Sequence, residues 1–452
     1  MEFFYLLLIV WFLTFWLIYN YRKSDLDFTS LPLLFLLVGN FGFSRAFSLI
    51  NINIAGIPIF ITELLIFIAV ILFFVRGKVN NFCFYIPQKI LIPFCFYLLI
   101  SSIYFLKGLL TGNLLVLRDD VFVLYPILFF YTTTVFNCEE DFKYLMRILI
   151  PALIILILIG ISKNIYMLFK GDAFIFIVEN VKNFNFVLNL GIAMVFYSVF
   201  LLYNNKYKFI LVAKFLLLCL GVALIIIAGV RSSWVAFSVS IIFLIILTRN
   251  RLFVVKSKKM FFLFLVILFF LVALFIYMNP EAFNNITSRI YGLFDWNSQR
   301  GAEVRWRLSI WAQVLKDSLR HPFLGRGFGN PQEYIVWGET LGKVKTVSFE
   351  SGIIPPHNYL LTVFSKIGAI GLLFLLIFIV NIFKAGLVAF KETASEFKKR
   401  VLAGLLASLL YWNVMALFFD VFDSPVTNIY LWVILGALVG LSYLDKAFLK
   451  NI

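Results

Sequence analysis

The chain has 452 residues, of which 63% are hydrophobic and 14% are charged, and 56 of them are phenylalanine. Its mean hydropathy is +1.00. A soluble globule of this length has too little interior for so many apolar side chains, so the composition excludes a soluble protein. The formal charge of +16 is explained by the basic cytoplasmic loops of a membrane protein, and it does not indicate nucleic acid as a partner.

Apolar runs recur along the whole chain. A helix needs about 20 apolar residues to cross the hydrocarbon core. The first run has no basic segment before it and no small-residue cleavage site after it, so we interpret it as a retained helix. The sequence predicts an all-α fold, a polytopic transmembrane helix bundle of about 12 to 13 spans. The runs lie near Phe3, Leu33, Ile57, Ile86, Val121, Leu145, Phe184, Phe209, Trp234, Met260, Tyr359, Val401 and Val426.

Lysine and arginine predict the orientation, because short basic loops stay in the cytoplasm. Basic clusters such as 249–259 alternate along the chain, which puts the C-terminus inside and one large polar loop, 280–357, outside. We expect this loop to be helical. Cations nevertheless remain in that extracytoplasmic loop and favour an anionic partner there. They are Arg289, Arg300, Arg305, Arg307, Lys316, Arg320, Arg326, Lys343 and Lys345.

Within this loop, apolar residues at spacings of three and four predict an amphipathic helix over 303–320. It is expected to lie on the membrane or to pack against the bundle. His321-Pro322 ends the helix, and Gly325, Gly327 and Gly329 predict a flexible or tightly turned loop. Their spacing looks like a nucleotide-binding fingerprint, but they follow a helix and no βαβ unit is present, so we discount that interpretation.

The second of the two histidines, His357, follows Pro355-Pro356 where the chain re-enters the membrane. We expect it in the first turn of a transmembrane helix, where the helix dipole favours an anion and a neutral imidazole. A neutral imidazole beside a phosphate can act as a general base. The alternative is an interfacial histidine that only caps or packs. His321, within a His-Pro helix stop, is interpreted as structural.

Arg231 lies in a loop of a few residues between two apolar runs. An arginine so close to the bilayer is costly unless it is paired, and its guanidinium fork suits a phosphate. The alternatives are a snorkelling side chain or a partner for a carboxylate such as Asp420 or Asp423.

Several of these residues belong to motifs that resemble the O-antigen ligase and polymerase family. The resemblance covers roughly 229–380 and implies a core there that includes the loop 280–357, with an N-terminal transmembrane bundle at 1–228 and C-terminal transmembrane helices at 381–452. The motifs are Arg231-Ser-Ser-Trp, Arg305-Trp-Arg307-Leu-Ser-Ile-Trp311, His321-Pro-Phe-Leu-Gly-Arg-Gly-Phe-Gly329, His357-Asn-Tyr-Leu-Leu and Gly368-Ala-Ile-Gly371.

The resemblance implies a glycosyltransferase of the bacterial inner membrane. It would move a glycan from an undecaprenyl-diphosphate-linked donor to an acceptor hydroxyl on the outer face by a metal-independent, inverting route without a cofactor. The acceptor is lipid A core for a ligase and a carrier-linked glycan for a polymerase, and we favour the ligase. A solute transporter is a more distant alternative, because no internal repeat is recognisable; a non-catalytic scaffold is a third.

The same resemblance implies roles for individual residues. His357 would be the catalytic base, and Arg231 with one arginine of the predicted helix would hold the diphosphate. The family's spacing of arginine four residues before tryptophan points to Arg307, and Arg305 remains an almost equal candidate. Arg300, Arg326 and Asn358 are secondary candidates.

Asp119-Asp120 could in principle coordinate a cation. We interpret the pair instead as a partner of Arg118 or of another arginine. The acidic residues of the polar loop show no metal-binding spacing, so we expect no metal.

Overall fold

The computed structural model describes most of the chain from residue 30 to residue 448. The described ranges are 30–158 without 44–46, 48–49, 55–56, 80–85, 113, 137–138, 146–148, 151 and 155; 184–248 without 202–207 and 229; 301–330; 334–338; 343–347; 356–419; and 425–448. The runs near Phe3 and Met260 lie outside these residues, as does Arg300.

The described part of the chain consists mainly of helices joined by turns, with two short hairpins. The helices are α2 (Leu31–Phe43), α4 (Ile61–Val79), α5 (Gln88–Leu110), the 3-10 helix η2 (Leu114–Phe122), α6 (Ile127–Val135), α9 (Phe184–Leu201), α10 (Lys208–Ile227), α11 (Arg231–Thr248), α14 (Gly301–Ser318), α15 (Tyr359–Glu392), α16 (Glu396–Ala416) and α17 (Pro425–Phe448). Strands β1 (Asn51–Ile54) and β2 (Ile57–Phe60) form one antiparallel hairpin, and β3 (Tyr334–Gly338) and β4 (Lys343–Val347) form the other.

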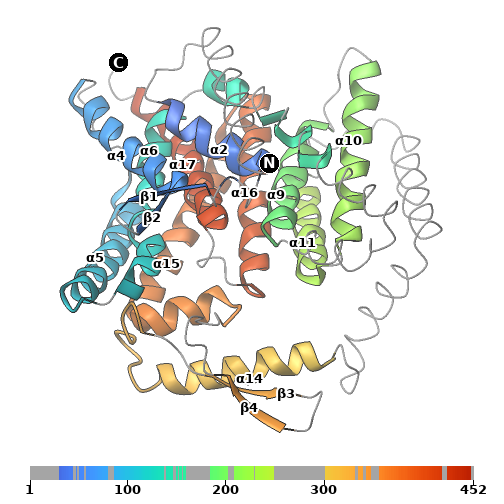
Figure 1. Ribbon diagram of the computed structural model, residues 1–452. Coiled ribbons are helices and arrows are strands. Elements are labelled where there is room, and N and C mark those ends of the chain that lie inside the picture. Colours follow the sequence, from blue (N-terminus) through green and yellow to red (C-terminus); the bar gives the residue numbers. More distant parts are fainter. Residues whose placement is uncertain are drawn as a thin grey trace.

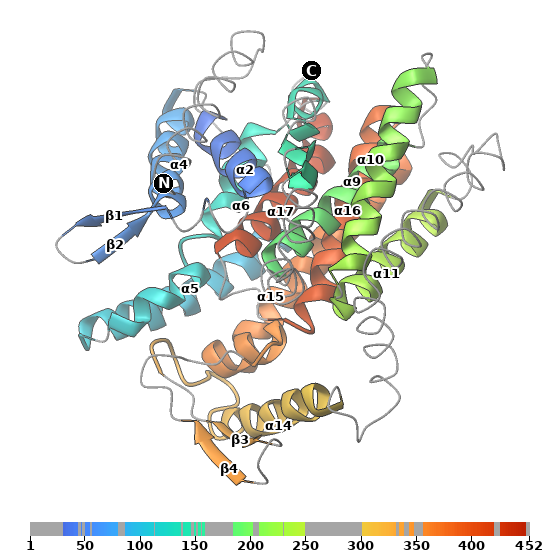
Figure 2. The same cartoon turned by 45° about the vertical axis from the view of Figure 1, so that its right-hand side comes forward.

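Three of these helices, α5, α11 and α15, are long and apolar enough to cross a membrane, and shorter apolar helices accompany them. The protein is thus a multi-pass membrane protein, and the all-α fold class expected from the sequence is confirmed. Helices α15, α16 and α17 pack together in the middle of the bundle, with α5 and α6 on one side and α9, α10 and α11 on the other (Figures 1 and 2). Helix α14 and the β3–β4 hairpin lie together at one end.

Aromatic rings fill the junction between α5, α6, α15 and α17. Phe94 of α5 lies 4.8 Å from Phe378 of α15 and 5.0 Å from Phe129 of α6, measured between ring centroids. Trp432 of α17 meets Phe94 in an edge-on contact at 5.9 Å. Tilted and edge-on pairs of this kind stabilise a core beyond the area that they bury, so this cluster fixes α15 against its neighbours.

Two predicted spans have a different local structure. The run near Val121 divides into η2 and the nine-residue α6, because Pro126 and the charged residues Arg118-Asp119-Asp120 interrupt it. The run near Ile57 begins as strand β2, and α4 starts only at Ile61. The polar loop is not wholly helical either, since it contains the β3–β4 hairpin. Its amphipathic helix is present as α14, two residues earlier than predicted.

The long helix α15 is broken at Gly368, which has φ 71° and ψ −175°. Such a break frees backbone groups that need partners at membrane depth. The segment 321–330, which we call the glycine loop, supplies them. Arg326 N donates to Ser365 O at 2.8 Å and Gly327 N to Lys366 O at 3.0 Å, while Ala369 N donates to Pro322 O at 2.8 Å and Ile370 N to Phe323 O at 3.2 Å.

The glycine loop is tightly turned, one of the two alternatives that the sequence left open. Gly325, Gly327 and Gly329 all have positive φ, between 73° and 83°. A Cβ on Gly325 would lie 2.6 Å from Gly368 N, so the loop and the helix touch backbone to backbone. The loop's amides are also engaged, because Gly325 N donates to His321 O and Gly329 N to Asp119 Oδ2, both at 2.9 Å. A phosphate-binding use of these glycines is therefore excluded in this conformation.

We expect Gly368→Ala to lower the thermal stability of the protein. Its backbone conformation costs a non-glycine residue roughly 1–3 kcal/mol, and the new Cβ would overlap the carbonyl of Phe323. The matched control is Gly112→Ala, since Gly112 also has positive φ but has no atom within 4 Å of the added Cβ. The midpoint of thermal unfolding in detergent measures both, and equal losses would show that the close approach to the glycine loop contributes nothing.

Candidate functional site

Helix α14 is fixed against the start of α15. The side chains of Ile310, Val314 and Ser318 are buried on one face of it, and Trp311 Nε1 donates to Pro356 O at 2.6 Å. Arg307 lies three, four, seven and eleven positions before Ile310, Trp311, Val314 and Ser318, so it belongs to the same face of α14. That face turns Arg307 toward the segment that carries His357.

His357 lies one residue before the N-cap of α15, and not in the first helical turn as predicted. Asn358 is the N-cap, with its side-chain Oδ1 accepting from Leu361 N at 3.2 Å. His357 itself has φ 50°, a left-handed conformation that is uncommon outside glycine and is often found at functional sites. The Pro356 carbonyl, held by Trp311, and the Asn358 cap fix the backbone on both sides of the histidine.

The electrostatic environment keeps the imidazole of His357 neutral. Burial, and after it the positive charge of Arg307, lower the pKa of His357 from 6.5 to about 4. The neutral state agrees with the expectation from the sequence, but its causes are burial and a neighbouring guanidinium, where we had expected the helix dipole. The same observation separates the two arginines of α14, since it is Arg307 whose charge reaches the histidine.

The start of α11 lies beside the same part of the bundle as the start of α15. Ser233 Oγ is 2.8 Å from the hydroxyl of Tyr411 in α16. Tyr359 OH donates to Asn413 Oδ1 at 3.2 Å, and its ring lies 5.7 Å from that of Trp412. Because Tyr411 to Asn413 form less than one helical turn, α16 brings the first turns of α11 and α15 to one place.

Arg231 is the first residue of α11, two positions before Ser233, and His357 stands two positions before Tyr359. Arg231 and His357 therefore both stand close to residues that contact the C-terminal part of α16, and Arg307 lies near enough to His357 for its charge to act on the imidazole. Phe419, just beyond that end, has its ring 5.4 Å from the imidazole. Asp420 and Asp423, considered as partners of Arg231, lie outside the described residues.

The remaining candidates stand elsewhere. Arg305 is half-buried and shares its helical face with the exposed Ala312 and Lys316, away from the buried face of α14. Arg326 belongs to the glycine loop, with its Nη1 3.6 Å from Asp317 Oδ2 and its carbonyl accepting from Asn330 Nδ2 at 2.6 Å. Asn358 acts on the backbone as a helix cap.

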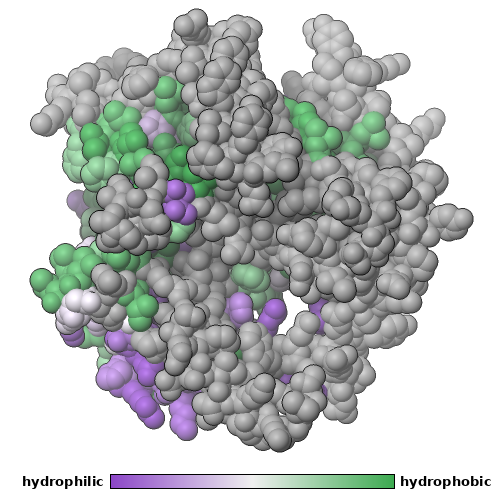
Figure 3. Space-filling model, in the orientation of Figure 1, coloured by the Kyte–Doolittle hydropathy of each residue, from purple (hydrophilic) through white to green (hydrophobic). Residues whose placement is uncertain are grey.

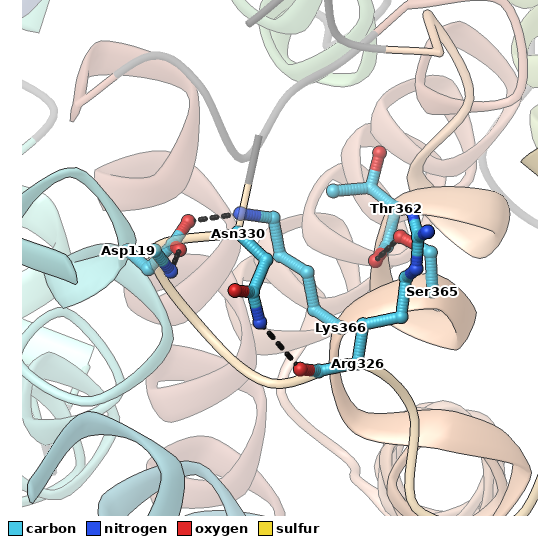
Figure 4. Close-up of polar contacts among 7 residues, drawn as sticks. Asp119, Arg326, Asn330, Thr362, Ser365 and Lys366 are labelled. Carbon is cyan, nitrogen blue, oxygen red and sulfur yellow. Dashed lines mark hydrogen bonds and ion pairs between the residues drawn. The ribbon is translucent and has the colours of Figure 1, made fainter. Parts of the chain in front are cut away.

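Asp119 is paired with a lysine, so the expected arginine partner is wrong. Its Oδ1 accepts from Lys366 Nζ of α15, and its Oδ2 accepts from Gly329 N at 2.9 Å (Figure 4). Both side chains are largely buried. A carboxylate that holds an ammonium and a backbone amide is a structural partner for the glycine loop and the broken helix.

Sequence reasoning missed the residues that position the site. Trp311 was recognised only as part of a family motif and of the apolar face of the predicted helix, without its hydrogen bond to Pro356, and Tyr411 and Asn413 were not singled out. A signal was present for Asn413, because an amide inside the apolar run Ser408-Leu-Leu-Tyr-Trp-Asn-Val-Met415 must find a hydrogen-bond partner at membrane depth.

Part of the chain matches a known protein family. Residues 215–376 match the model of a protein family described as O-Antigen ligase. This part of the chain is an O-antigen ligase domain. It begins within α10, ends within α15, and so contains the starts of α11 and α15, helix α14 and the glycine loop. A search of the curated proteins found no match.

The O-antigen ligase domain is shared by ligases and polymerases that transfer glycans at a membrane from lipid-linked substrates. The family resemblance seen in the sequence is thereby confirmed. The matched residues include Arg231, Arg307 and His357.

We expect Arg307→Gln to raise the pKa of His357. The value should stay below 6.5, because burial is the larger cause of the lowering and remains in the variant. The two histidines make the measurement direct, since in a His321→Gln background the ¹³C-labelled imidazole signal belongs to His357 alone. Arg305→Gln is the matched control, and a shift of equal size in both variants would contradict the placement of Arg307.

Proposed function

We propose that the protein transfers a glycan from undecaprenyl diphosphate to an acceptor hydroxyl on the extracytoplasmic face, with His357 as the base and Arg307 and Arg231 as the diphosphate-binding residues. The observation that carries the proposal is a neutral histidine beside the guanidinium of Arg307, at the start of a long apolar helix of the O-antigen ligase domain.

In the proposed reaction the acceptor hydroxyl attacks the anomeric carbon of the donor sugar. The bond from that carbon to the phosphate oxygen breaks, and its electron pair leaves with the diphosphate. His357 takes the proton of the hydroxyl. Attack from the side opposite the leaving group inverts the configuration at the anomeric carbon, and no metal is required for this route.

The arginines act on the leaving group. A diphosphate gains negative charge as the glycosidic bond breaks, and guanidinium groups placed at that position stabilise the transition state. The planar fork of arginine can bind two phosphate oxygens at once, which a lysine ammonium cannot do.

Binding of the donor also prepares the base. A pKa of about 4 makes free His357 a weak base at neutral pH. A diphosphate bound at Arg307 offsets the positive charge that lowers this pKa, and its own negative charge favours the imidazolium that forms. The histidine therefore becomes a stronger base only when the donor is in place.

We expect His357→Gln to reduce glycan transfer by about 10²–10⁴-fold, the usual contribution of a general base, and to leave donor binding nearly unchanged. Arg307→Lys and Arg231→Lys should weaken both transfer and donor binding, because lysine offers no bidentate fork. Single-turnover rates and binding of the purified variants to undecaprenyl diphosphate measure the two effects.

Arg305→Lys is the control for Arg307→Lys, because it makes the same change on the other side of α14. Transfer in Arg307→Lys equal to that in Arg305→Lys would remove Arg307 from the proposed site. Strongly weakened donor binding in His357→Gln would contradict its role as a base.

The reaction itself is tested with an undecaprenyl-diphosphate-linked oligosaccharide, offered with and without lipid A core in the presence of a chelator. We expect a product only with lipid A core, identified by mass, and an unchanged rate in chelator. A ladder of longer glycans without lipid A core would assign the protein to the polymerases. Loss of all activity in chelator, restored by a divalent cation, would contradict the metal-independent route.

A further inference from the structure

Helix α14 has an exposed apolar stripe next to its buried face. Leu308, Ala312, Leu315 and Leu319 follow one another at spacings of four, three and four residues, and all four are exposed. The stripe continues past the end of the helix, where Phe323 and Leu324 are 68% and 55% exposed, more than most apolar residues of the bundle.

This stripe adjoins the surface that α15 and α5 turn outward. Phe323 O accepts from Ile370 N at 3.2 Å, and the large exposed apolar side chains of α15 begin at Ile370 and continue with Leu373, Ile377 and Val380. Helix α5 lies alongside, with Phe96 stacked on Phe374 at 4.8 Å. It exposes a stripe of its own, formed by Ile92, Phe96, Leu99, Ile103, Leu106 and Leu110.

Both α5 and α15 are long and apolar enough to cross a membrane, so their exposed stripes face lipid. Phe323 stands at the break in α15, with its carbonyl hydrogen-bonded to Ile370, the first large apolar residue exposed after the break, and Leu324 follows it. In Figure 3 hydrophobic residues cover the region of α4 and α5, and hydrophilic residues gather below them, at the edge where α14 and the glycine loop lie in Figure 1. The apolar stripe of α14 therefore lies where the hydrocarbon region ends.

A basic edge accompanies the stripe. Lys316 and Arg320 are exposed and follow Ala312 at spacings of four residues, so they lie along one side of the apolar residues. The Arg320 side chain is 68% exposed, with only a loose contact of 3.9 Å to Asp317. An apolar stripe bordered by exposed cations is the pattern of helices that lie in a membrane interface and contact anionic headgroups.

We propose that α14 and residues 319–324 form an interfacial anchor, which inserts Leu315, Leu319, Phe323 and Leu324 into the adjoining leaflet and binds anionic lipid headgroups through Lys316 and Arg320. The inference is independent of the catalytic roles proposed above. It gives α14 two distinct sides, since its buried face carries Arg307 to His357 while its apolar edge fixes the depth of the helix in the membrane.

The depth of spin labels in nanodiscs tests the anchor. The four native cysteines of the full chain are replaced by alanine, and one new cysteine is introduced at Leu319 or at Phe323 and spin-labelled. The microwave power saturation of each label is then measured in the presence of oxygen or of a water-soluble nickel complex. A label at Leu99 of α5 serves as the lipid-facing reference and one at Glu140, whose side chain is 72% exposed in an ion pair, as the aqueous reference.

We expect the labels at positions 319 and 323 to resemble the one at 99, with greater access to oxygen than to nickel. Nickel access equal to that at position 140 would place the stripe in water and overturn the proposal. Labels shielded from both reagents would overturn it too, because they would show a protein surface, a second copy included, covering the stripe.

The headgroup contact has its own test. Exchanging phosphatidylglycerol for phosphatidylcholine should move the label at position 323 toward water, and Lys316→Gln with Arg320→Gln should abolish this lipid dependence. Lys384→Gln with Lys391→Gln removes the same charge from the exposed far part of α15 and should leave the dependence unchanged. An equal loss in both double variants would refute a specific role of the basic edge.

Discussion

The structure depends on the way in which α15 is broken and repaired. A helix interrupted at Gly368 leaves carbonyl and amide groups unpaired at membrane depth, where each costs several kcal/mol. The glycine loop donates two amides to the helix and accepts two from it, all between main-chain atoms. This exchange attaches the end of α14 to α15, and with it determines where the buried face of α14 meets the bundle.

The proposed chemistry follows from what that attachment brings together. Trp311 holds the Pro356 carbonyl, Asn358 caps the helix, and His357 is fixed between them in a left-handed backbone conformation. A guanidinium next to a buried neutral imidazole is an unfavourable arrangement for protonation of the histidine. Protonation of His357 becomes favourable once an anion lies beside the imidazole and the guanidinium. The negative charge of a lipid diphosphate would have this effect. In the proposed mechanism, His357 therefore accepts a proton readily only when the donor is bound.

The sequence was sufficient for the class of fold, and it also singled out the candidate site residues. Hydropathy predicts a membrane bundle because lipid permits few other structures, and Arg231 stands out because a charged group near a bilayer is expensive. His357 stands out by its place where the chain re-enters the membrane, while Arg307 was indicated by the family resemblance. Periodicity also predicted α14, within two residues. It could not choose between Arg305 and Arg307, because both border the apolar stripe and only the tertiary structure shows which face of α14 is buried.

Other features were beyond the sequence because they depend on distant partners. The ion pair of Asp119 with Lys366 joins residues 247 positions apart, and arginine had been the expected partner. The left-handed His357 and its place before the N-cap depend on the Trp311 bond across 45 positions. The three glycines of the glycine loop predicted a turn correctly, but their partner, a break inside an apolar helix, is visible in the sequence only as one more glycine.

The hydrogen bonds across the break at Gly368 join main-chain atoms, so this region can tolerate many amino-acid substitutions. Side chains contribute none of the four hydrogen bonds across the break, so the shape of the backbone, and not the identity of most residues, is what selection has to keep. Gly325 and Gly368 are then fixed by sterics. Positions 323 and 324, just before Gly325, remain free to change, limited by the environment that their side chains face. The glycine loop can thereby adapt its outer surface to a different membrane or acceptor without moving the histidine and arginines behind it.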